Sequence, residues 1–364
     1  MTANPDNNTV AGRHVVLSVD AMGGDRGPAA VVAGISRFAK TTENVSFILH
    51  GPEDQLKRLV KRRRHLRDRV EFRNATGVVS MEDKPSQIMR SGKDTSMWSA
   101  IESVKSNEAK VCISNGNTGA LMALSMIRLR KLPGVNRPAI AVLWPSRNPS
   151  ETNIVLDVGA DIRADEADLL QFALMGTSYA RNGLGLERPR VGLLNVGTED
   201  NKGRPELKSA ADLISYNADA ANFEFVGFVE GNDMPSSKVD VIVTDGFTGN
   251  VALKTAEGTA QLIREALKEA FSYSPLSRIA ALMAITSLRR LTQKIDPRRK
   301  NGGVFLGLNG TVVKSHGSAD ATSFAAAIKL AHQLALSDFS EKIAARVASA
   351  TTLEQDTEQP SSGA

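Results

Sequence analysis

The stretch that decides the fold is Val239-Asp240-Val241-Ile242-Val243-Thr244-Asp245-Gly246-Phe247-Thr248-Gly249-Asn250-Val251-Ala252-Leu253-Lys254. Its first part is mostly apolar and β-branched, which predicts a buried strand. The glycine-rich turn that follows leads into a helical pattern. Backbone N–H groups of such a turn and helix start converge on one point, where they stabilise an anion.

A second turn of the same type occurs earlier in the chain. Asn115-Gly116-Asn117-Thr118-Gly119 follows the apolar run at 111–113, and both turns read Asn or Asp, then Gly-x-Thr-Gly. One such turn is weak support for an anion site. Two of them, at the ends of two strands, predict a shared site.

Strand-like and helix-like runs alternate along the chain. Apolar strands between helices predict a parallel sheet covered on both faces. Because ligands of open α/β sheets bind at the carboxyl ends of the strands, we expect one cleft lined by Asp20, Asn115, Asp157, Asn195, Asp245 and His316. The predicted strands are 15–19, 46–49, 111–113, 139–143, 153–156, 191–194, 223–226, 239–243 and 311–313, and the predicted helices are 29–39, 53–64, 119–130, 164–181, 207–217, 249–271 and 321–336.

The composition is ordinary for a soluble protein, with 364 residues, 41% hydrophobic and 23% charged. The single cysteine, Cys112, excludes an internal disulfide and a cysteine-rich zinc site. No Asp/His cluster at ligand spacing predicts a metal, and we expect no cofactor. The polar start of the chain does not read as a signal peptide, and no run approaches the roughly 20 apolar residues of a membrane-spanning helix. A cytoplasmic location fits these features.

The formal net charge of +5 is distributed unevenly. Residues 57–73 are rich in lysine and arginine, and a second basic cluster lies at 289–300. The first cluster has one aromatic residue, Phe72, and no interleaved stacking pattern, which favours a solvated helix face over a nucleic-acid site. We therefore expect no nucleic-acid partner.

We expect a disordered tail at 1–13, a single α/β domain at 14–338 with an amphipathic helical excursion at 261–303, and a helix end with a disordered tail at 339–364. Within the excursion, Ser274-Pro275 ends one helix and starts another. The second helix mixes apolar and basic residues, as a helix does that lies on a membrane surface or packs on its own core or a dimer mate. The predicted membrane contacts are Leu276, Ile279, Leu282, Met283, Leu288, Arg289 and Arg290.

Eight short motifs stand in the order that a known family has. They are Val19-Asp20-Ala21-Met22-Gly23-Gly24-Asp25, Gly116-Asn117-Thr118-Gly119-Ala120, Arg137-Pro138-Ala139, Leu156-Asp157-Val158-Gly159-Ala160, Phe172-Ala173-Leu174-Met175-Gly176, Leu193-Leu194-Asn195-Val196-Gly197, Asp245-Gly246-Phe247-Thr248-Gly249-Asn250-Val251 and Lys314-Ser315-His316-Gly317-Ser318. Together, over residues 15–336, they resemble the bacterial phosphate acyltransferases, which convert acyl-acyl-carrier-protein and inorganic phosphate to acyl phosphate. The chain departs from the family at Asn115, where a small residue is usual, at Thr198-Glu199, where two acids are usual, and at 296–300, which is more basic than usual.

The resemblance implies a three-layer α/β/α fold similar to isopropylmalate dehydrogenase and phosphotransacetylase. It implies a homodimer that acts in the first steps of phospholipid synthesis and is peripherally associated with the inner face of the cell membrane. The implied partners are acyl carrier protein, inorganic phosphate, the membrane surface and a downstream glycerol-phosphate acyltransferase.

Attack of phosphate on a thioester needs positioning and charge stabilisation more than covalent help. The leaving pantetheine thiol resembles a free cysteine, with a pKa of about 8.5, and needs little acid assistance. The predicted catalytic residues are Lys254, His316, Asn250 and Asp245. The predicted phosphate- or substrate-binding residues are Asp20, Gly23, Gly24, Asn115, Gly116, Asn117, Thr118, Gly119, Asn195, Lys202, Gly246, Thr248, Gly249, Lys314 and Ser318.

Structural alternatives stay open for these residues. Lys254 can point to solvent, His316 can serve a turn, and Asp245 and Asn250 can cap the turn and helix. Two other functions also stay open: a short-chain acyl-CoA transferase of the phosphotransacetylase type, and a non-catalytic membrane scaffold for lipid synthesis. An oxidoreductase is disfavoured, because no Gly-x-Gly-x-x-Gly follows a strand with an acid about 20 residues on.

Overall fold

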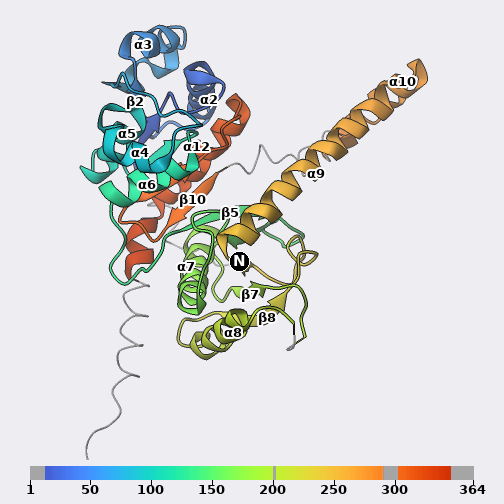
Figure 1. The fold of residues 1–364 in the computed structure, drawn as a ribbon. Helices are drawn as coiled ribbons and strands as arrows, with labels where there is room; N and C mark the ends of the chain where they lie inside the picture. Colours follow the sequence, from blue (N-terminus) through green and yellow to red (C-terminus); the bar gives the residue numbers. More distant parts are fainter. Residues whose placement is uncertain (1–12, 200–201, 289, 291–301, 346–364) are drawn as a thin grey trace, which may run out of the picture.

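The computed structural model describes residues 13–199, 202–288, 290 and 302–345, which form a central sheet with helices on both faces (Figure 1). The strands are β1 (Val15–Asp20), β2 (Val45–Gly51), β3 (Val70–Asn74), β4 (Val111–Ser114), β5 (Ala139–Pro145), β6 (Thr152–Leu156), β7 (Arg190–Leu194), β8 (Glu224–Val229), β9 (Val241–Val243), β10 (Gly303–Leu306) and β11 (Thr311–Lys314). The helices are α2 (Gly27–Ala39), α3 (Glu53–Lys61), α4 (Pro85–Ser91), α5 (Ser96–Lys105), α6 (Thr118–Arg128), α7 (Glu166–Leu184), α8 (Pro205–Asn217), α9 (Gly246–Ser272), α10 (Pro275–Met283) and α12 (Ala321–Leu336), with short 3₁₀ turns η1 (Arg64–Arg69) and η2 (Gly92–Asp94).

The 11-stranded sheet has the order β3-β2-β1-β4-β11-β10-β5-β6-β9-β7-β8. Neighbouring strands from β3 to β11 pair in parallel, and so do those from β6 to β8. Between these two blocks, the pairs β11–β10, β10–β5 and β5–β6 are antiparallel. Three antiparallel steps reverse the direction once overall, so the two parallel blocks run in opposite directions.

The two faces of the sheet bury separate cores. In β4, Val111 and Ile113 point into one core and Cys112 into the other, as the alternation of side chains along a strand requires. Helices α2, α3, α7, α8 and α12 supply the first core, and α5, α6 and the start of α9 pack on the second. The predicted fold class, a mostly parallel three-layer α/β/α arrangement, is confirmed.

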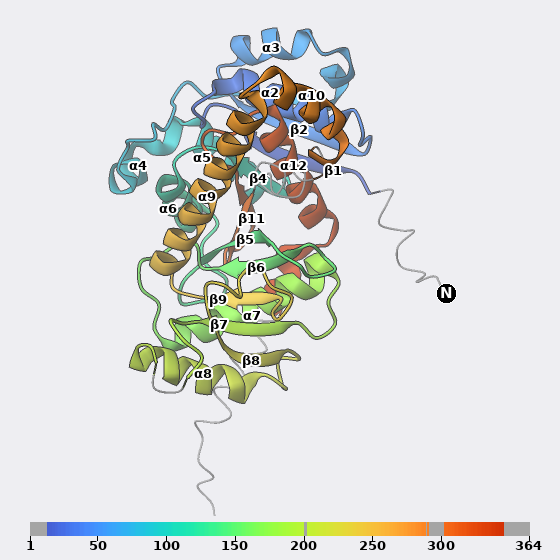
Figure 2. The same cartoon turned by 90° about the vertical axis from the view of Figure 1, so that its right-hand side faces the viewer.

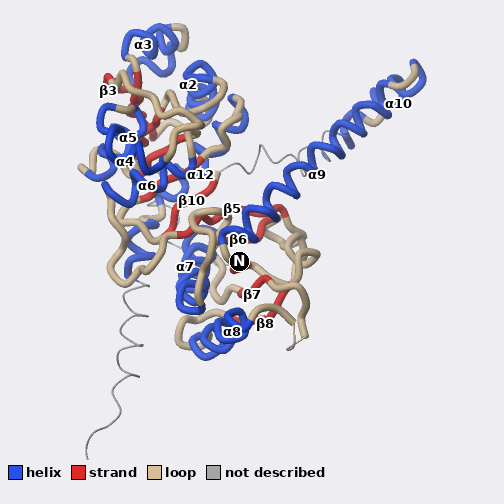
Figure 3. Tube along the Cα trace, in the orientation of Figure 1, coloured by secondary structure: helices blue, strands red, loops and turns tan. Residues whose placement is uncertain are grey.

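All of the predicted strands and helices are present, but two strands and two helices were not predicted. Strand β3 reads Val-Glu-Phe-Arg-Asn and lies at the edge of the sheet, where charged residues are tolerated. Strand β10 is a short apolar run, which periodicity alone cannot distinguish from a buried helix segment. Helices α4 and α5 are the unpredicted helices. Both precede β4 in the chain, and Figure 3 shows them beside α6.

Helices α9 and α10 form an arm that projects from the body in Figure 1 and lies in front of the body in the view of Figure 2. In α9 the fully buried residues are Gly246 and Gly249, both in its first turn, and no residue of α10 is buried. The exposed fractions on α10 are 76% for Leu276, 66% for Leu282 and 83% for Met283. The arm therefore presents apolar side chains that the body does not cover.

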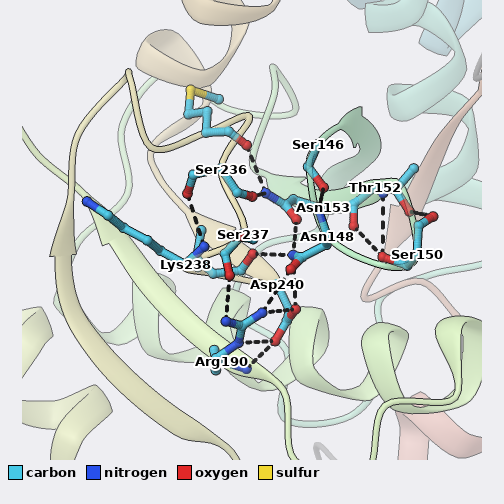
Figure 4. A network of polar contacts seen from close by, with 12 residues as sticks. Ser146, Asn148, Ser150, Thr152, Asn153, Arg190, Ser236, Ser237, Lys238 and Asp240 are labelled. Carbon is cyan, nitrogen blue, oxygen red and sulfur yellow. Dashed lines mark hydrogen bonds and ion pairs between the residues drawn. The ribbon is translucent and has the colours of Figure 1, made fainter. Parts of the chain in front are cut away.

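The amino ends of β6, β7 and β9 are closed by a self-satisfied polar network (Figure 4). Arg190 donates from Nε and from Nη2 to the two carboxylate oxygens of Asp240 at 2.9 and 2.8 Å. Asn148 donates to Asp240 at 3.1 Å and to the side-chain oxygen of Asn153 at 2.6 Å. These polar side chains satisfy one another's hydrogen bonds. Their role at the amino ends of the strands is therefore structural, and no ligand is needed to explain them.

The predicted division into domains and tails stays a prediction. Phe339 and Ile343 belong to the first core, so packed structure extends past residue 338. The predicted excursion at 261–303 begins inside α9, which continues unbroken from the body to Ser272. The predicted tails at 1–12 and 346–364 lie outside the described residues.

Candidate active site

Asp20 ends β1 with a buried carboxylate held by two hydroxyl groups. Its Oδ1 accepts a hydrogen bond from Ser96 Oγ at 2.7 Å, and its Oδ2 accepts one from Ser114 Oγ at 2.7 Å. Burial raises the pKa of Asp20, and the hydrogen bonds from Ser114 and Ser96 work against that rise. The Ser114 hydroxyl in turn accepts from the backbone N–H of Gly116 at 3.1 Å. Asp20 thus ties the first glycine turn to the ends of β1 and β4.

The loop after β1 packs directly on that turn. A Cβ atom at Gly23 would lie 2.7 Å from the backbone nitrogen of Gly116, and one at Gly24 would overlap the side-chain amide of Asn115. The backbone N–H of Asp25 donates to the carbonyl of Gly317 at 3.0 Å. The loops after β1, β4 and β11 therefore meet at one place, which brings together many of the residues predicted for substrate binding.

Two asparagines of this turn behave differently. Asn117 caps α6, because its Oδ1 accepts from the N–H of Ala120 at 3.0 Å, and its Nδ2 donates to the carbonyl of Met81 at 2.9 Å. Thr118 and Gly119 begin α6 next to it. The side chain of Asn115 is 1% exposed, and neither its Nδ2 nor its Oδ1 has a hydrogen-bond partner in the described structure. A buried amide without partners is costly, and neither of its polar atoms is exposed in this structure.

Lys314 ends β11 beside these loops. Burial and the positive charge of Lys254 lower the pKa of Lys314 to about 8, and the carboxylates of Asp25 and Asp20 oppose that shift. Its Nζ donates to the carbonyl of Ser315. Two lysines predicted to act on an anion, one at the end of β11 and one on α9, therefore lie close enough to influence each other.

Glu257 joins Lys254 to His316. Its Oε2 lies 2.9 Å from Lys254 Nζ and 3.5 Å from His316 Nε2. Burial opposes the charged form of Glu257, but the contacts with His316 and Lys254 outweigh it and lower the pKa of its carboxyl. Nδ1 of His316 accepts from the backbone N–H of Ser318 at 3.3 Å, which leaves the proton of the neutral ring on Nε2, facing Glu257. We call Lys254, Glu257, Lys314 and His316 the junction site.

The second glycine turn is occupied by its own residues. Asp245 caps α9, with Oδ1 accepting from the N–H of Thr248 at 2.8 Å, and its Oδ2 pairs with Arg204. A Cβ atom at Gly246 would overlap the carbonyl oxygen of Asp161, and one at Gly249 would overlap that of Asp157. The two glycines let α9 approach the loop after β6 closely. This close packing accounts for glycine at both positions, and no bound ligand is needed to explain it. Their predicted roles at the anion stay predictions.

The polar turns do not all follow strands of one direction, and the expectation that they line one cleft stays a prediction. Because the two parallel blocks run in opposite directions, the carboxyl ends of β1 and β4 lie at one edge and those of β7 and β9 at the other. Helix α9 links the edges, since eight residues at 1.5 Å each carry it about 12 Å from Gly246 to Lys254. Lys254 and Glu257, which follow a strand of one block, thereby come close to His316, which follows a strand of the other block.

Other residues predicted for the site remain at the second edge. Asn250 is exposed and lies against Gly159. Asn195 donates from Nδ2 to the carbonyl of Lys202 at 3.3 Å, and the Lys202 residue is exposed. No contact in the described ranges places these residues at the junction site, and their roles stay predictions.

His50, a buried histidine that the sequence analysis did not select, supports the hydrogen bonds of Asp20 indirectly, by joining β1 to α5. Ser18 donates to the carbonyl of Ala100 at 2.8 Å, so its oxygen accepts from His50 Nε2 at 2.9 Å. Nδ1 of His50 then accepts from Ser99 at 2.8 Å. Burial lowers the pKa of His50 to about 3, which keeps the ring neutral. His50 and Ser99 fix α5, the helix that presents Ser96 to Asp20.

Sequence reasoning also missed Glu257, Ser96, Ser114 and Arg204. Glu257 had a readable signal, because a residue three positions after Lys254 lies on the same face of a helix. The serines had none, since their partner Asp20 is distant in the chain. In the part of the chain that the structure describes, no three His, Cys, Asp or Glu side chains gather to hold a metal ion.

Four of the predicted membrane residues lie on α10 of the arm. Leu276, Ile279, Leu282 and Met283 are exposed, Arg290 is exposed, and Leu288 is partly buried. Arg289 lies outside the described residues. Among the described helices, none has the length and apolar character needed to cross a bilayer.

Comparisons with known proteins agree with the motifs. The chain matches the family model described as "Fatty acid synthesis protein" over residues 15–342. It is 68% identical over 356 residues to the phosphate acyltransferase of Ruegeria sp. (strain TM1040), covering 98% of this chain and 95% of that protein. It is 67% identical over 351 residues to the phosphate acyltransferase of Paracoccus denitrificans (strain Pd 1222), covering 95% of each.

Two solved structures share the fold. A phosphotransacetylase from Streptococcus pyogenes matches with a TM-score of 0.59 and 14% identity, over 92% of this chain and 99% of that one. The EutD phosphotransacetylase from Staphylococcus aureus matches with a TM-score of 0.58 and 13% identity, over 90% of this chain and 96% of that one. These structural similarities confirm the predicted phosphotransacetylase-like fold. The evidence for the function comes from the close relatives and the family model. The chain therefore belongs to the phosphate acyltransferase family and is an enzyme of acyl transfer to or from phosphate.

Proposed function

We propose that the enzyme transfers a fatty acyl group from acyl-acyl-carrier-protein to inorganic phosphate, giving acyl phosphate for phospholipid synthesis. The observation that carries this proposal is the junction site. Lys254, Lys314 and His316 bring two ammonium groups and an imidazole N–H to the place where three strand-end loops meet. That set of donors fits an anionic nucleophile.

The reaction needs a single displacement at the thioester carbonyl. An oxygen of phosphate forms the new bond to the carbonyl carbon, and the tetrahedral intermediate then breaks its C–S bond. The electron pair leaves with the pantetheine sulfur, and the thiolate takes a proton from water, because its pKa is close to that of a free cysteine at about 8.5. The enzyme has to hold two anionic partners together and stabilise the developing oxyanion.

Residues of the site divide these tasks. Lys254 and Lys314 reduce the repulsion between phosphate and the growing negative charge on the carbonyl oxygen. His316 donates through Nε2 to the same anion, and Ser318 holds the ring from its other nitrogen. A substrate contact of Asn115 would require its buried amide, which has no partner in the described structure, to become exposed to phosphate or to the carbonyl oxygen.

An acyl carrier protein as donor is supported by the match to the family model described as "Fatty acid synthesis protein" and by the resemblance of the eight motifs to the phosphate acyltransferases. Incubation of the purified protein with palmitoyl-acyl-carrier-protein and phosphate should release free carrier thiol. Absence of phosphate-dependent release overturns the proposal. Preferred turnover of short-chain acyl-CoA over the carrier-bound substrate would instead assign the phosphotransacetylase-type alternative. The non-catalytic scaffold is set aside, because the relatives are acyltransferases.

We also propose that the enzyme works in the cytoplasm as a homodimer on the inner face of the cell membrane. The exposed apolar residues of α10 support membrane contact, and exposed Leu262 and Ile263 on α9 support a contact between two copies. There the product would pass to a downstream glycerol-phosphate acyltransferase. Flotation with vesicles of anionic phospholipid should carry the wild-type protein and lose Leu282→Asp, whereas equal flotation of both contradicts the role of α10. Sedimentation as a monomer would contradict the dimer.

A further inference from the structure

The carboxylate of Glu257 lies where an anion would be bound. It takes the ammonium of Lys254 at 2.9 Å and faces Nε2 of His316 at 3.5 Å. Both partners are groups that the proposed function assigns to phosphate. An oxygen of phosphate, like an oxygen of a carboxylate, accepts charge-assisted hydrogen bonds from such donors.

Glu257 and phosphate cannot share these partners. Phosphate carries between about one and two negative charges near neutral pH, and like charges within a few ångströms repel strongly where solvent is partly excluded. Asp25 and Asp20 already place negative charge near Lys314. A third carboxylate in direct contact with Lys254 leaves little net positive charge for the substrate.

Glu257 can leave without moving the backbone. It lies on α9, which has no buried residue after Gly249, and its side chain is 29% exposed. Its backbone belongs to a helix while its carboxylate reaches toward the body, so rotation about its side-chain torsions moves the carboxylate into solvent. Lys254, on the same face of the helix, would stay in place.

We propose that Glu257 is an internal competitor of phosphate: its carboxylate occupies the anion position of the ligand-free junction site and has to withdraw before phosphate binds. The inference rests on the proposed function and adds a determinant of phosphate affinity to it. A positioning role for the same residue makes the opposite prediction, because a residue that holds Lys254 and His316 ready for phosphate strengthens phosphate binding.

The test compares the wild-type protein with Glu257→Gln and with the matched control Glu265→Gln. Glu265 lies on the exposed part of α9, where it accepts from Gln261 at 2.9 Å, away from the junction site. Titration of each protein with inorganic phosphate alone, followed by calorimetry, gives the dissociation constant without an acyl donor. Steady-state turnover of palmitoyl-acyl-carrier-protein then gives the KM for phosphate.

Glu257→Gln should bind phosphate about two- to fivefold more tightly, with the KM for phosphate falling in the same proportion, as expected from removing one partly exposed ion pair. Glu265→Gln should match the wild type. Equal or weaker binding of phosphate by Glu257→Gln overturns the inference. Absence of phosphate-dependent turnover in the wild type counts against the proposed function separately, and the binding titration still decides whether Glu257 competes with phosphate.

Discussion

Nε2 of His316 lies 3.5 Å from Oε2 of Glu257, although the two residues come from opposite blocks of the sheet. His316 follows β11, and Glu257 is carried on α9, which begins after β9. The antiparallel strands between the blocks would separate their carboxyl ends, and α9 closes that separation. The junction site therefore lies at the place where one long helix crosses from one block to the other.

Loss of Lys254 or His316 should reduce catalysis and leave the fold intact. For Lys254→Ala and His316→Ala we expect kcat/KM for phosphate to fall about 10- to 100-fold, the effect of losing a hydrogen bond to a charged group. Thermal unfolding should be nearly unchanged, because both side chains are about half exposed. Lys268→Ala, on the exposed arm, is the control. Wild-type rates in both site variants would remove these residues from the mechanism.

Lys314 should give activity an alkaline limb. Burial lowers its pKa to about 8, with Lys254 acting in the same direction and Asp25 and Asp20 against it. The cation is present below that pH and is lost above it, so kcat/KM for phosphate should decline as pH rises through about 8. Lys314→Arg keeps its charge beyond pH 12, and its decline should move to higher pH. A profile that is identical in the two proteins contradicts a role for the Lys314 charge.

His50 should make the protein sensitive to acid. Its pKa is about 3 in the folded chain and 6.5 ordinarily, so the unfolded chain binds the extra proton first as pH falls. The stability held by the neutral ring is complete above pH 6.5 and is lost progressively below it, by about 2 kcal/mol at pH 5. Urea unfolding at pH 7 and pH 5 should show a larger loss for the wild type than for His50→Gln. The same loss in both would show that His50 is not the group responsible.

The glycines of the second turn should prove to be packing residues. Gly249→Ala places a methyl group on the carbonyl of Asp157 and should cost about 1–3 kcal/mol or more of folding free energy. Gly258→Ala, later on the same helix with open space around it, should instead stabilise by about 0.5–1 kcal/mol. Chemical denaturation measures both. If Gly249→Ala kept its stability and bound phosphate more weakly, the second glycine turn would instead be part of the phosphate-binding site.

The sequence predicts most individual helices and strands, because a buried strand and an amphipathic helix each have a recognisable local pattern of apolar residues. Strand direction is different, since nothing within β10 states that it pairs antiparallel with both β5 and β11. The reversal follows from contacts between distant segments. It also means that the two glycine turns follow strands of opposite direction, and their sharing of one cleft stays a prediction.

Prediction of the site succeeds where neighbours in the chain act together and stops where partners are distant. Lys254, Lys314 and His316 are readable as cations and donors near strand ends, and the structure brings them together. Asp245 reads equally well as an anion ligand or a helix cap, and its bond to the N–H of Thr248 shows it acting as the cap. The role of Glu257 depends on His316, which no local pattern connects to it.

In the proposed reaction, phosphate itself attacks a carrier-bound acyl thioester. The most direct test of this reaction is to quantify palmitoyl phosphate by mass spectrometry and free carrier thiol in the same quenched samples of purified enzyme, palmitoyl-acyl-carrier-protein and phosphate. One palmitoyl phosphate is expected for each thiol released, and neither product is expected when phosphate is omitted. Release of thiol without phosphate, or of free palmitate in place of palmitoyl phosphate, would contradict the proposed reaction.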